Sequence, residues 1–276
     1  MYELRRVLVA TDGSDRGACA VVTGVHLARR AGAQLHVVSV ADSLLPTRYV
    51  ARDGGLAIEE VMLQSARRIA EAQVREAKAT HPSLHIISGA PAPTIAELAG
   101  KISADIIVVG AHHRPELERI LFGSTAERET RMAPCPVFAA TARRRTPFRR
   151  VLAAVDFSPR ANGVIEAASA MVRIDDAEFR ILHVNEPLPL MPRAIPKSEV
   201  EALAEANRVT FERVIREAGE IPKCELVEQT GYAGPEILRE ARDWNAQLLV
   251  VGSQGLGFFS RMILGSTSSY ILRHGE

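Results

Sequence analysis

The sequence is poor in cysteine, and the three it has cannot build a disulfide framework or a zinc site. Cys19, Cys135 and Cys224 are widely separated, odd in number and never part of a Cys-x-x-Cys pair. Such usage is typical of proteins in a reducing compartment. The N-terminus, MYELRRVLVAT, contains charged residues and lacks the apolar run and cleavage pattern of a secretory signal. We therefore expect a cytoplasmic protein.

Long apolar runs and an excess of one charge are also missing. No window approaches the ~20 apolar residues of a membrane-spanning helix, and the formal net charge is only +1. The basic cluster Arg143–Arg145 falls where we place a linker between two domains, so a solvated linker is the favoured interpretation. The sequence thus predicts neither a nucleic-acid nor a membrane partner. At 276 residues, the chain is long enough for two globular domains.

What the chain does contain is an internal repeat. The segment Arg5–Ser14, RRVLVATDGS, recurs as Arg149–Ser158, RRVLAAVDFS, at an offset of 144 residues. After a region of altered length the offset becomes 142, and it holds through to the aligned triplets Gly123–Thr125 and Gly265–Thr267. Two matched blocks in the same order indicate a duplication. We predict one domain over residues 1–142 and a second over residues 149–276.

Each copy alternates strands with helices. In the second copy, short β-branched runs predict strands, and apolar residues at helical spacing with capping residues predict helices. The strands are expected at 150–155, 178–184, 225–229 and 247–252, and the helices from Ser158 as N-cap to Val172, then at 198–218, 234–244 and 265–272. This order indicates an α/β fold, a parallel doubly wound sheet with helices on both faces. Such sheets bind ligands beyond the carboxyl ends of their strands, where the strand order reverses.

A glycine-rich loop lies at that edge in the second copy. It runs GSQGLGFFSRMILGS from Gly252 to Ser266, and the helix beginning near Gly265 offers N–H groups and a positive dipole end to an anion. Glycines also permit positive φ and let the backbone approach a ligand without an intervening Cβ. From this chemistry alone, glycines that merely form turns are an equally open interpretation. The loop contains neither a Walker sequence nor a complete dinucleotide fingerprint.

The spacing Gly252-x2-Gly255-x9-Gly265-Ser266 resembles that of the ATP-binding members of the universal stress protein family. The Asp ending the first strand, the His-Val pair ending the second and the glycine ending the fourth agree with that family. Because the resemblance covers both halves, the chain looks like a tandem member with two Rossmann-like domains of the adenine nucleotide alpha hydrolase-like type. It implies ATP, with magnesium as a companion ion, in a regulatory stress-response protein. It also implies an intramolecular pseudo-dimer, a homodimer, or both.

By position, the resemblance implies nucleotide contacts in both copies. The loop glycines and the start of the helix are expected to contact the phosphates and the ribose. The aspartate is expected near the nucleotide, and the backbone at the end of the second strand is expected to contact adenine. In the second copy these residues are Asp156, Val184, Gly252, Gly255, Gly265, Ser266 and Thr267. The weaker candidates of the first copy are Asp12, Val40, Gly110, Gly123 and Ser124. For both aspartates, a simple helix-capping role is the alternative.

The first copy departs from the family pattern in its loop. His113 replaces the second glycine, and Glu116 and Glu118 place negative charge beside a polyphosphate. We expect this site to be weakened or lost, although a protonated His113 would help to bind an anion. The pair His112-His113 has no third ligand near in sequence, so a solvated loop is favoured over a metal site. His36 and His183, in predicted strands, are expected to be satisfied structural residues.

No catalytic arrangement stands out. The chain has no serine in a Gly-x-Ser-x-Gly elbow, and the His-x-Gly-His and Ser-Gly-Gly-x-Asp-Ser motifs of adenylyl-transferring relatives are absent. At most a slow ATPase is expected. The alternative to nucleotide binding is a scaffold that binds proteins. The second copy also stops before a counterpart of the fifth strand expected after Pro136, which would leave a sheet edge uncovered.

Overall fold

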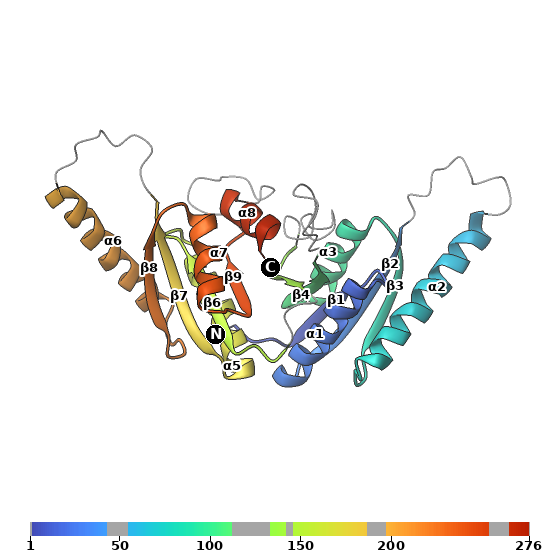
Figure 1. Cartoon of the computed structure of the whole chain (residues 1–276). Helices are drawn as coiled ribbons and strands as arrows, with labels where there is room; N and C mark the ends of the chain where they lie inside the picture. The colour runs from blue at the N-terminus through green and yellow to red at the C-terminus, as the bar shows by residue number, and fades with distance from the viewer. Residues whose placement is uncertain are drawn as a thin grey trace. The chain divides into compact units, whose positions relative to one another are not determined.

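The computed structural model describes residues 2–42, 55–111, 133–141, 146–186, 197–253 and 265–275. The chain divides into two compact units, one of residues 3–146 and the other of residues 147–275 with the first two residues. Each unit is an α/β domain built on a parallel sheet (Figure 1). The predicted fold class, two parallel-sheet α/β domains in tandem, is therefore confirmed.

The first domain is built on a sheet with the strand order β3-β2-β1-β4-β5, in which every pair is parallel. The described elements, in chain order, are β1 (Arg6–Ala10), α1 (Asp15–Ala31), β2 (Gln34–Asp42), α2 (Gly55–Glu76), β3 (Ser83–Gly89), α3 (Pro91–Ile102), β4 (Ile106–Gly110) and β5 (Val137–Ala140). The central strands β1 and β4 are almost entirely buried, as their continuous β-branched runs predict.

The second domain repeats this plan with the strand order β8-β7-β6-β9, again parallel throughout. Its elements are β6 (Arg150–Val155), α5 (Ala161–Asp175), β7 (Glu178–Asn185), α6 (Lys197–Glu217), β8 (Glu225–Thr230), α7 (Ala233–Asp243), β9 (Leu248–Val251) and α8 (Ser266–His274). Among the described residues, none pairs with the edge of β9 that corresponds to the β5 side of β4. The uncovered edge expected from the sequence stays a prediction.

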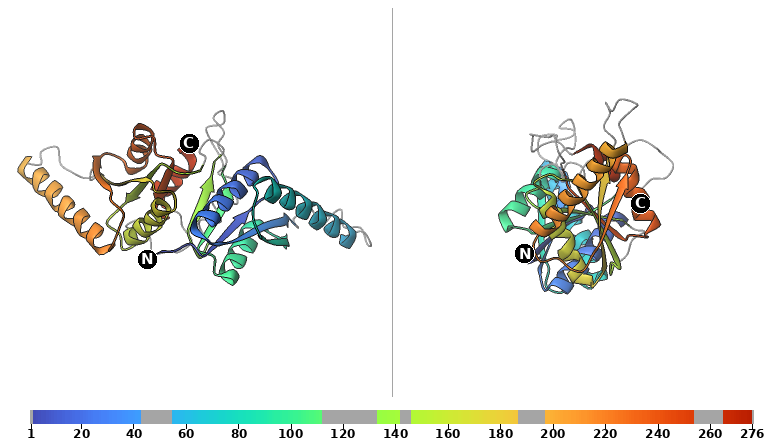
Figure 2. Two further views of the ribbon diagram at one scale, coloured as in Figure 1. Left: turned by 90° about the horizontal axis from the view of Figure 1, so that it is seen from below. Right: turned by 90° about the vertical axis from the view of Figure 1, so that its left-hand side faces the viewer.

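Helices cover both faces of each sheet because side chains alternate along the strands (Figure 2). In the first domain, Val9 faces α1 so closely that a Cβ added to Gly24 would lie 2.1 Å from its Cγ2. The neighbouring Leu8 faces the opposite way, into the cluster formed with Ile95 and Leu98 of α3. In the second domain, α7 and α8 cover the face that carries Leu152 and Val184, and α5 and α6 cover the other.

Left-handed residues stop the helices at the same places in both domains. Gly32 (φ 65°) ends α1, and its counterpart at the 144-residue offset, Asp176 (φ 52°), ends α5. Ser103 (φ 51°) follows α3, and Asn245 (φ 54°), at the 142-residue offset, follows α7. Each supplies the αL turn that satisfies carbonyl groups at a helix end.

The start of α5 differs from the prediction. Asp156 Oδ1 accepts the N–H of Ser158 at 3.1 Å, and Ser158 Oγ accepts the N–H of Arg160 at 3.3 Å. These two bonds hold an extra turn, so α5 begins at Ala161 with Arg160 as N-cap, instead of being capped by Ser158. In the first domain, by contrast, Ser14 is the N-cap of α1.

Candidate functional site

The carboxyl ends of β6, β7 and β9 lie level with one another. Val155 of β6 pairs with His183 of β7, and Ala154 pairs with Val251 of β9. Asp156 therefore follows at the level of Val184, with Gly252 one strand away. The chain passes from β6 to β7 and β8 on one side and returns to β9 on the other, so the strand order reverses between β6 and β9. This is the position at which doubly wound sheets bind ligands.

The first turn of α8 is fastened to the end of β9. The N–H of Gly265 donates to the Ser253 carbonyl at 2.8 Å, and the buried hydroxyl of Ser268 donates to the Gly252 carbonyl. Ser268 was not among the residues predicted for the site. Its only sequence signal is a hydroxyl in the first turn of a helix, a position that serine occupies for many reasons. These two bonds fix the start of α8 at the carboxyl edge of the sheet.

Gly265 is not required by backbone conformation. As the N-cap of α8 it has φ −61° and ψ 155°, which every L-residue adopts easily, so the expected need for positive φ does not apply here. The lack of a Cβ and of a capping side chain is the remaining reason for glycine. The N–H groups of Ser266 and Thr267 open the helix without an intrahelical acceptor. An exposed Ser266 and a half-buried Thr267 leave this helix start, with its positive dipole end, accessible to an anion.

The neighbouring helix α7 already holds an anion of the chain itself. Glu186, just beyond β7, accepts the N–H of Ala233, the first residue of α7, through Oε1 at 2.8 Å. Helices α7 and α8 pack closely at Gly234. A Cβ added to this glycine would lie 2.5 Å from Cδ1 of Tyr270 in α8. Of these two adjacent helix starts, α8 is therefore the one at which the described residues include no carboxylate partner.

Both strand-end aspartates take part in local turns. Asp12 Oδ1 accepts the N–H of Ser14 at 3.0 Å and its hydroxyl at 2.5 Å, and Ser14 Oγ in turn accepts the N–H of Gly17 at 3.2 Å. Asp12 thus supports the N-cap of α1 without being the cap. Asp156 holds Ser158 in the same way. Neither aspartate is the N-cap, so the helix-capping alternative is wrong, although each one accepts a backbone N–H in the turn before the helix.

An aromatic cluster supports the turn that carries Asp156. The Phe157 ring stacks on His183, with centroids 3.9 Å apart, and His183 also contacts Phe211 of α6 at 5.8 Å. His183 Nδ1 donates to the Val155 carbonyl at 2.9 Å. The prediction of a satisfied structural histidine is therefore confirmed for His183.

In the first domain, hydrogen bonds to the side-chain amide of Gln73 hold the equivalent turn. Thr11 Oγ1 donates to Gln73 Oε1 of α2 at 2.6 Å, and Gln73 Nε2 donates to the Ser14 carbonyl at 3.1 Å. Val40 and Gly110 lie at the carboxyl edge of this sheet, as predicted. A Cβ on Gly110 would lie 2.6 Å from the Arg16 carbonyl oxygen, so the close approach of α1 accounts for this glycine without a ligand.

Several predicted residues lie outside the part of the chain that the structure describes. They are Gly255 of the second loop, and His112, His113, Glu116, Glu118, Gly123 and Ser124 of the first. The linker arginines 143–145 lie outside it as well. Among the described residues there is no group of three or more His, Cys, Asp or Glu side chains that could hold a metal ion.

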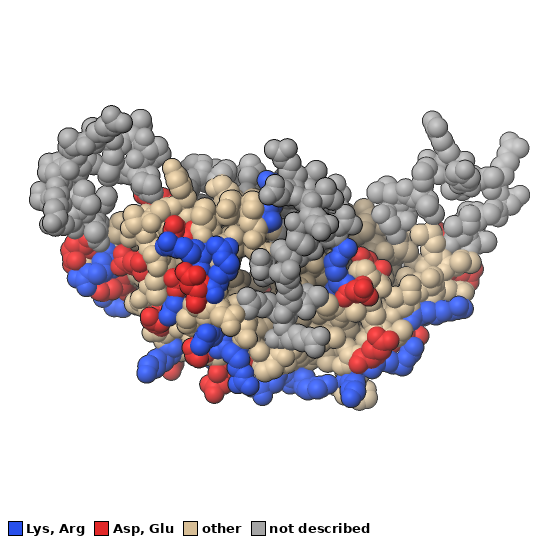
Figure 3. Space-filling model, in the orientation of Figure 1, with Lys and Arg blue, Asp and Glu red and all other residues tan. Residues whose placement is uncertain are grey.

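Positive and negative side chains are both present on the described surface. On the face drawn in Figure 3, basic and acidic side chains are interspersed on the described residues of both domains. Within the same described ranges, no helix is long and apolar enough to cross a membrane.

A duplicated parallel α/β domain with a glycine-led helix start at its carboxyl edge defines a tandem Rossmann-like protein. The model of the Universal stress protein family matches the chain twice, over residues 3–140 and 147–276. The chain therefore belongs to the universal stress protein family, as the resemblance of its loop spacing implies.

Individual relatives agree with this assignment. Universal stress protein Rv2005c of Mycobacterium tuberculosis is 26% identical over 280 residues, covering 96% of this chain and 92% of that protein. Universal stress protein MJ0531 of Methanocaldococcus jannaschii is 30% identical over 135 residues, which cover 48% of this chain and 79% of the relative. The crystal structure of a universal stress protein from Archaeoglobus fulgidus superposes with a TM-score of 0.70 at 22% identity, over 98% of this chain and 95% of that one. The match to Rv2005c extends over both domains of this chain, whereas the match to MJ0531 extends over about half of it.

Proposed function

We propose that this protein binds ATP at the carboxyl edge of its second sheet and acts as a regulatory nucleotide-binding protein of the stress response. The observation that carries the proposal is the start of α8, which is tied to the end of β9 through Gly265 and Ser268 and has no capping side chain. A polyphosphate is the type of ligand that such a helix start accommodates.

The roles of the individual residues follow from their places at this edge. The amides of Ser266 and Thr267, beside Gly265, would bind phosphate oxygens, with magnesium as the companion ion of the nucleotide. The loop glycines 252 and 255 would let the backbone approach the phosphates and ribose. Asp156 would lie beside the ribose, and the backbone of Val184 would contact adenine, as the family resemblance implies.

A regulatory role is favoured over catalysis by the chemistry at this edge. The titratable side chains Asp156 and His183 both make hydrogen bonds within the fold. Neither is placed as a general base by those contacts. We expect ATP occupancy to alter the partners or pairing of the protein, with turnover no faster than that of a slow ATPase.

Three further assignments belong to the same proposal. The functional domains extend over residues 1–142 and 149–276, with the first carrying a diverged loop and the second an intact one. The two domains pair within the chain or through a homodimer. The scattered cysteines favour the cytoplasm.

Calorimetric titration with magnesium-ATP tests the proposal. The wild-type protein should release heat with one site per chain, and Gly265→Val should bind about tenfold more weakly or worse, because one charged hydrogen bond is worth about 1.5–3 kcal/mol. The N-cap conformation of Gly265 accepts valine, so the change places a Cβ in front of the amides without straining the backbone.

Gly100→Val is the matched control. Gly100 lies on α3 of the first domain, and a Cβ added there meets nothing within 4 Å. This variant should bind as the wild type does. No heat with the wild type, or equal heat with Gly265→Val, would contradict the proposal and favour a scaffold, whereas rapid turnover of ATP would contradict the regulatory role.

A further inference from the structure

Two histidines of the first domain form a pair on adjacent strands. His36 Nδ1 of β2 and His85 Nε2 of β3 are 3.1 Å apart, and the two rings stack with centroids separated by 5.4 Å. Only one of the two facing nitrogens carries a proton in this hydrogen bond. His36 Nε2 is buried and has no hydrogen-bond partner among the described residues. The prediction that His36 is a fully satisfied structural histidine is therefore wrong for this nitrogen.

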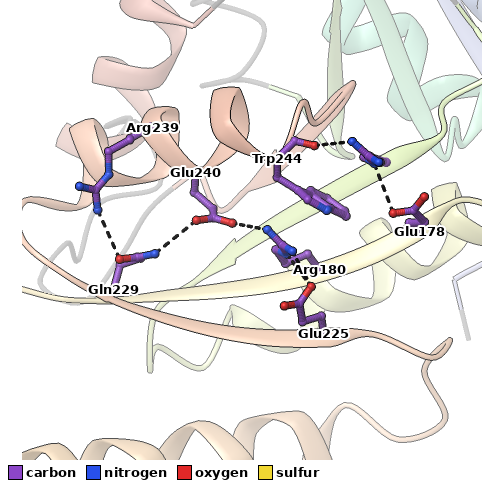
Figure 4. A network of polar contacts seen from close by, with 8 residues as sticks. Glu178, Arg180, Glu225, Gln229, Arg239, Glu240 and Trp244 are labelled. Carbon is purple, nitrogen blue, oxygen red and sulfur yellow. Dashed lines mark hydrogen bonds and ion pairs between the residues drawn. The ribbon is translucent and has the colours of Figure 1, made fainter.

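The second domain places a permanent cation at the same position. His36 pairs with Leu8 and Ser83, and Arg180 pairs with Leu152 and Glu225, which are the counterparts at the repeat offsets. Figure 4 shows how this arginine is compensated. It forms ion pairs with Glu225 and with Glu240 of α7, and its guanidinium lies 4.4 Å from the Trp244 ring.

None of these compensating groups has a counterpart around His36. The positions of Glu225, Glu240 and Trp244 are taken by Ser83, Leu98 and Ile102 in the first domain. Leu98 and Ile102 belong to the apolar cluster under α3. A positive charge at His36 would thus face an apolar helix surface where the second domain has a carboxylate.

The charged groups near the pair are positive or turned elsewhere. β1 contributes Arg6, whose guanidinium donates to the Ser103 carbonyl at 3.2 Å. After α3, Asp105 accepts the backbone N–H groups of Arg5 and Arg6, both at 2.7 Å. On α3, Glu97 and Lys101 are exposed.

Burial lowers the pKa of both imidazoles below the ordinary value of about 6.5. The charges of His85 and then Arg6 lower the pKa of His36 further.

We propose that the His36–His85 pair is an acid-sensitive latch that joins β2 to β3 and makes the first domain, but not the second, loosen as the pH falls. A second proton on the pair would place two N–H groups against each other at 3.1 Å. Two like charges at that separation, with no carboxylate of the described residues paired with them, favour a separated arrangement of the strands.

The direction of the pH effect follows from proton binding. The unfolded chain protonates these rings near pH 6.5, and the folded chain protonates them at lower pH. The unfolded state therefore binds more protons in this interval, so the free energy of unfolding of the first domain falls as the pH drops through about 6.5. The fall ends once the pH is below the folded-state pKa values. Arg180 keeps its charge throughout, so the position of the second domain that corresponds to His36 does not change its charge in this interval.

Histidine NMR titration and hydrogen exchange test this latch on the full chain. The His36 and His85 rings should titrate below the ordinary value of about 6.5. After correction for intrinsic exchange rates, protection of residues 34–42 and 83–89 should fall several-fold between pH 7.5 and 5.5. Protection of residues 225–230, the strand β8 that pairs with Arg180 and contains no histidine, should stay within twofold.

Two variants separate the latch from a general effect of acid. His85→Val introduces the residue found at the equivalent position of the second domain, Val227, and should abolish the pH-dependent loss of protection. His81→Asn removes an exposed histidine from a turn with φ 50°, a conformation that Asn tolerates, and should retain the loss. Equal loosening of both domains, persistence of the loss in His85→Val, or titration of the two rings at or above the ordinary value of about 6.5 would each overturn the proposal. If His85→Val does not fold at pH 7.5, His36→Gln replaces it with the same expectation.

Discussion

At the scale of single residues, the hydroxyl of Ser268 fixes the start of α8 at the carboxyl edge of the sheet. It is buried, and it joins the first turn of α8 to the carbonyl of Gly252, the residue that follows β9. A residue in this position sets the direction in which the helix amides point, although it would not itself contact a ligand.

Ser268→Ala should therefore weaken ATP binding about fivefold, because a buried hydrogen bond contributes about 1 kcal/mol. The measurement is a calorimetric titration of the variant beside Ser269→Ala, which changes the next residue of the same helix. Equal affinities for the two variants would show that Ser268 does not position the site.

Asp156 offers a test that separates turn formation from ligand contact. Asp156→Asn keeps an Oδ1 that can accept the N–H of Ser158, so the free energy of unfolding should change by less than about 0.5 kcal/mol. The amide has only one acceptor oxygen, and ATP affinity should fall. Denaturant unfolding and calorimetry on the same preparation give both values, and a loss of stability without a loss of affinity would assign Asp156 to the turn alone.

The partners of Arg180 should contribute unequally to stability. Glu240 is 11% exposed and Glu225 is 60% exposed in their side chains. Glu240→Ala leaves a half-buried cation with one solvated partner and should cost about 2 kcal/mol, whereas Glu225→Ala should cost less than about 1 kcal/mol. Urea unfolding measures the difference, and equal losses would contradict it.

The sequence predicted the features of single residues that depend on the order of strands and helices. It did not predict the features that depend on tertiary packing. The positions of Asp156, Val184 and Gly252 at one sheet edge follow from the alternation of strands and helices, which predicts a parallel sheet. The conformation of Gly265 and the unpaired nitrogen of His36 depend on contacts between distant segments. A single sequence carries no sign of such contacts.

At the scale of helices and strands, side chains at the turns decide where each helix begins. Ser14 caps α1 directly by accepting the N–H of Gly17, whereas the equivalent Ser158 accepts the N–H of Arg160 in a turn before the helix, and α5 starts later. The helix predicted from Ser158 is present, but the prediction of Ser158 as its N-cap is wrong, because the hydrogen bonds of the turn move the start to Ala161.

Loss of the cap should accordingly differ between the copies. Ser14→Ala removes the side-chain acceptor for the N–H of Gly17 and should lower the free energy of unfolding of the first domain by about 1 kcal/mol. Ser158→Ala should have a smaller effect, since Ser158 accepts only one longer bond outside the helix. Hydrogen exchange in residues 15–31 and 161–175 resolves the two domains, and an equal or larger loss for Ser158→Ala would argue against the difference.

At the scale of the whole molecule, the two domains share a fold but differ in their chemistry at equivalent positions. The cation at β7 is compensated by carboxylates, the imidazole pair at β2 and β3 is not, and only the second glycine loop keeps the family spacing. The domains should therefore respond to different signals.

ATP should stabilise one domain selectively. At a concentration of 100 times its Kd, a ligand that binds only the folded state adds about 2.7 kcal/mol to the free energy of unfolding. Hydrogen exchange should show this gain in residues 150–155 and 178–185 and little change in residues 6–10 and 34–42. Equal protection in both domains would indicate two sites, or strong coupling between the domains.

The turns that end the helices keep the same backbone conformation in both copies although their residues differ. Where the first domain has Gly32 at φ 65°, the second has Asp176 at φ 52°, and Ser103 and Asn245 differ by only three degrees. A non-glycine residue in this region costs about 1 kcal/mol. The surrounding elements of the second domain have imposed the turn in spite of that cost. The same left-handed turn is thus kept at equivalent helix ends whether the residue that makes it is glycine, aspartate, serine or asparagine.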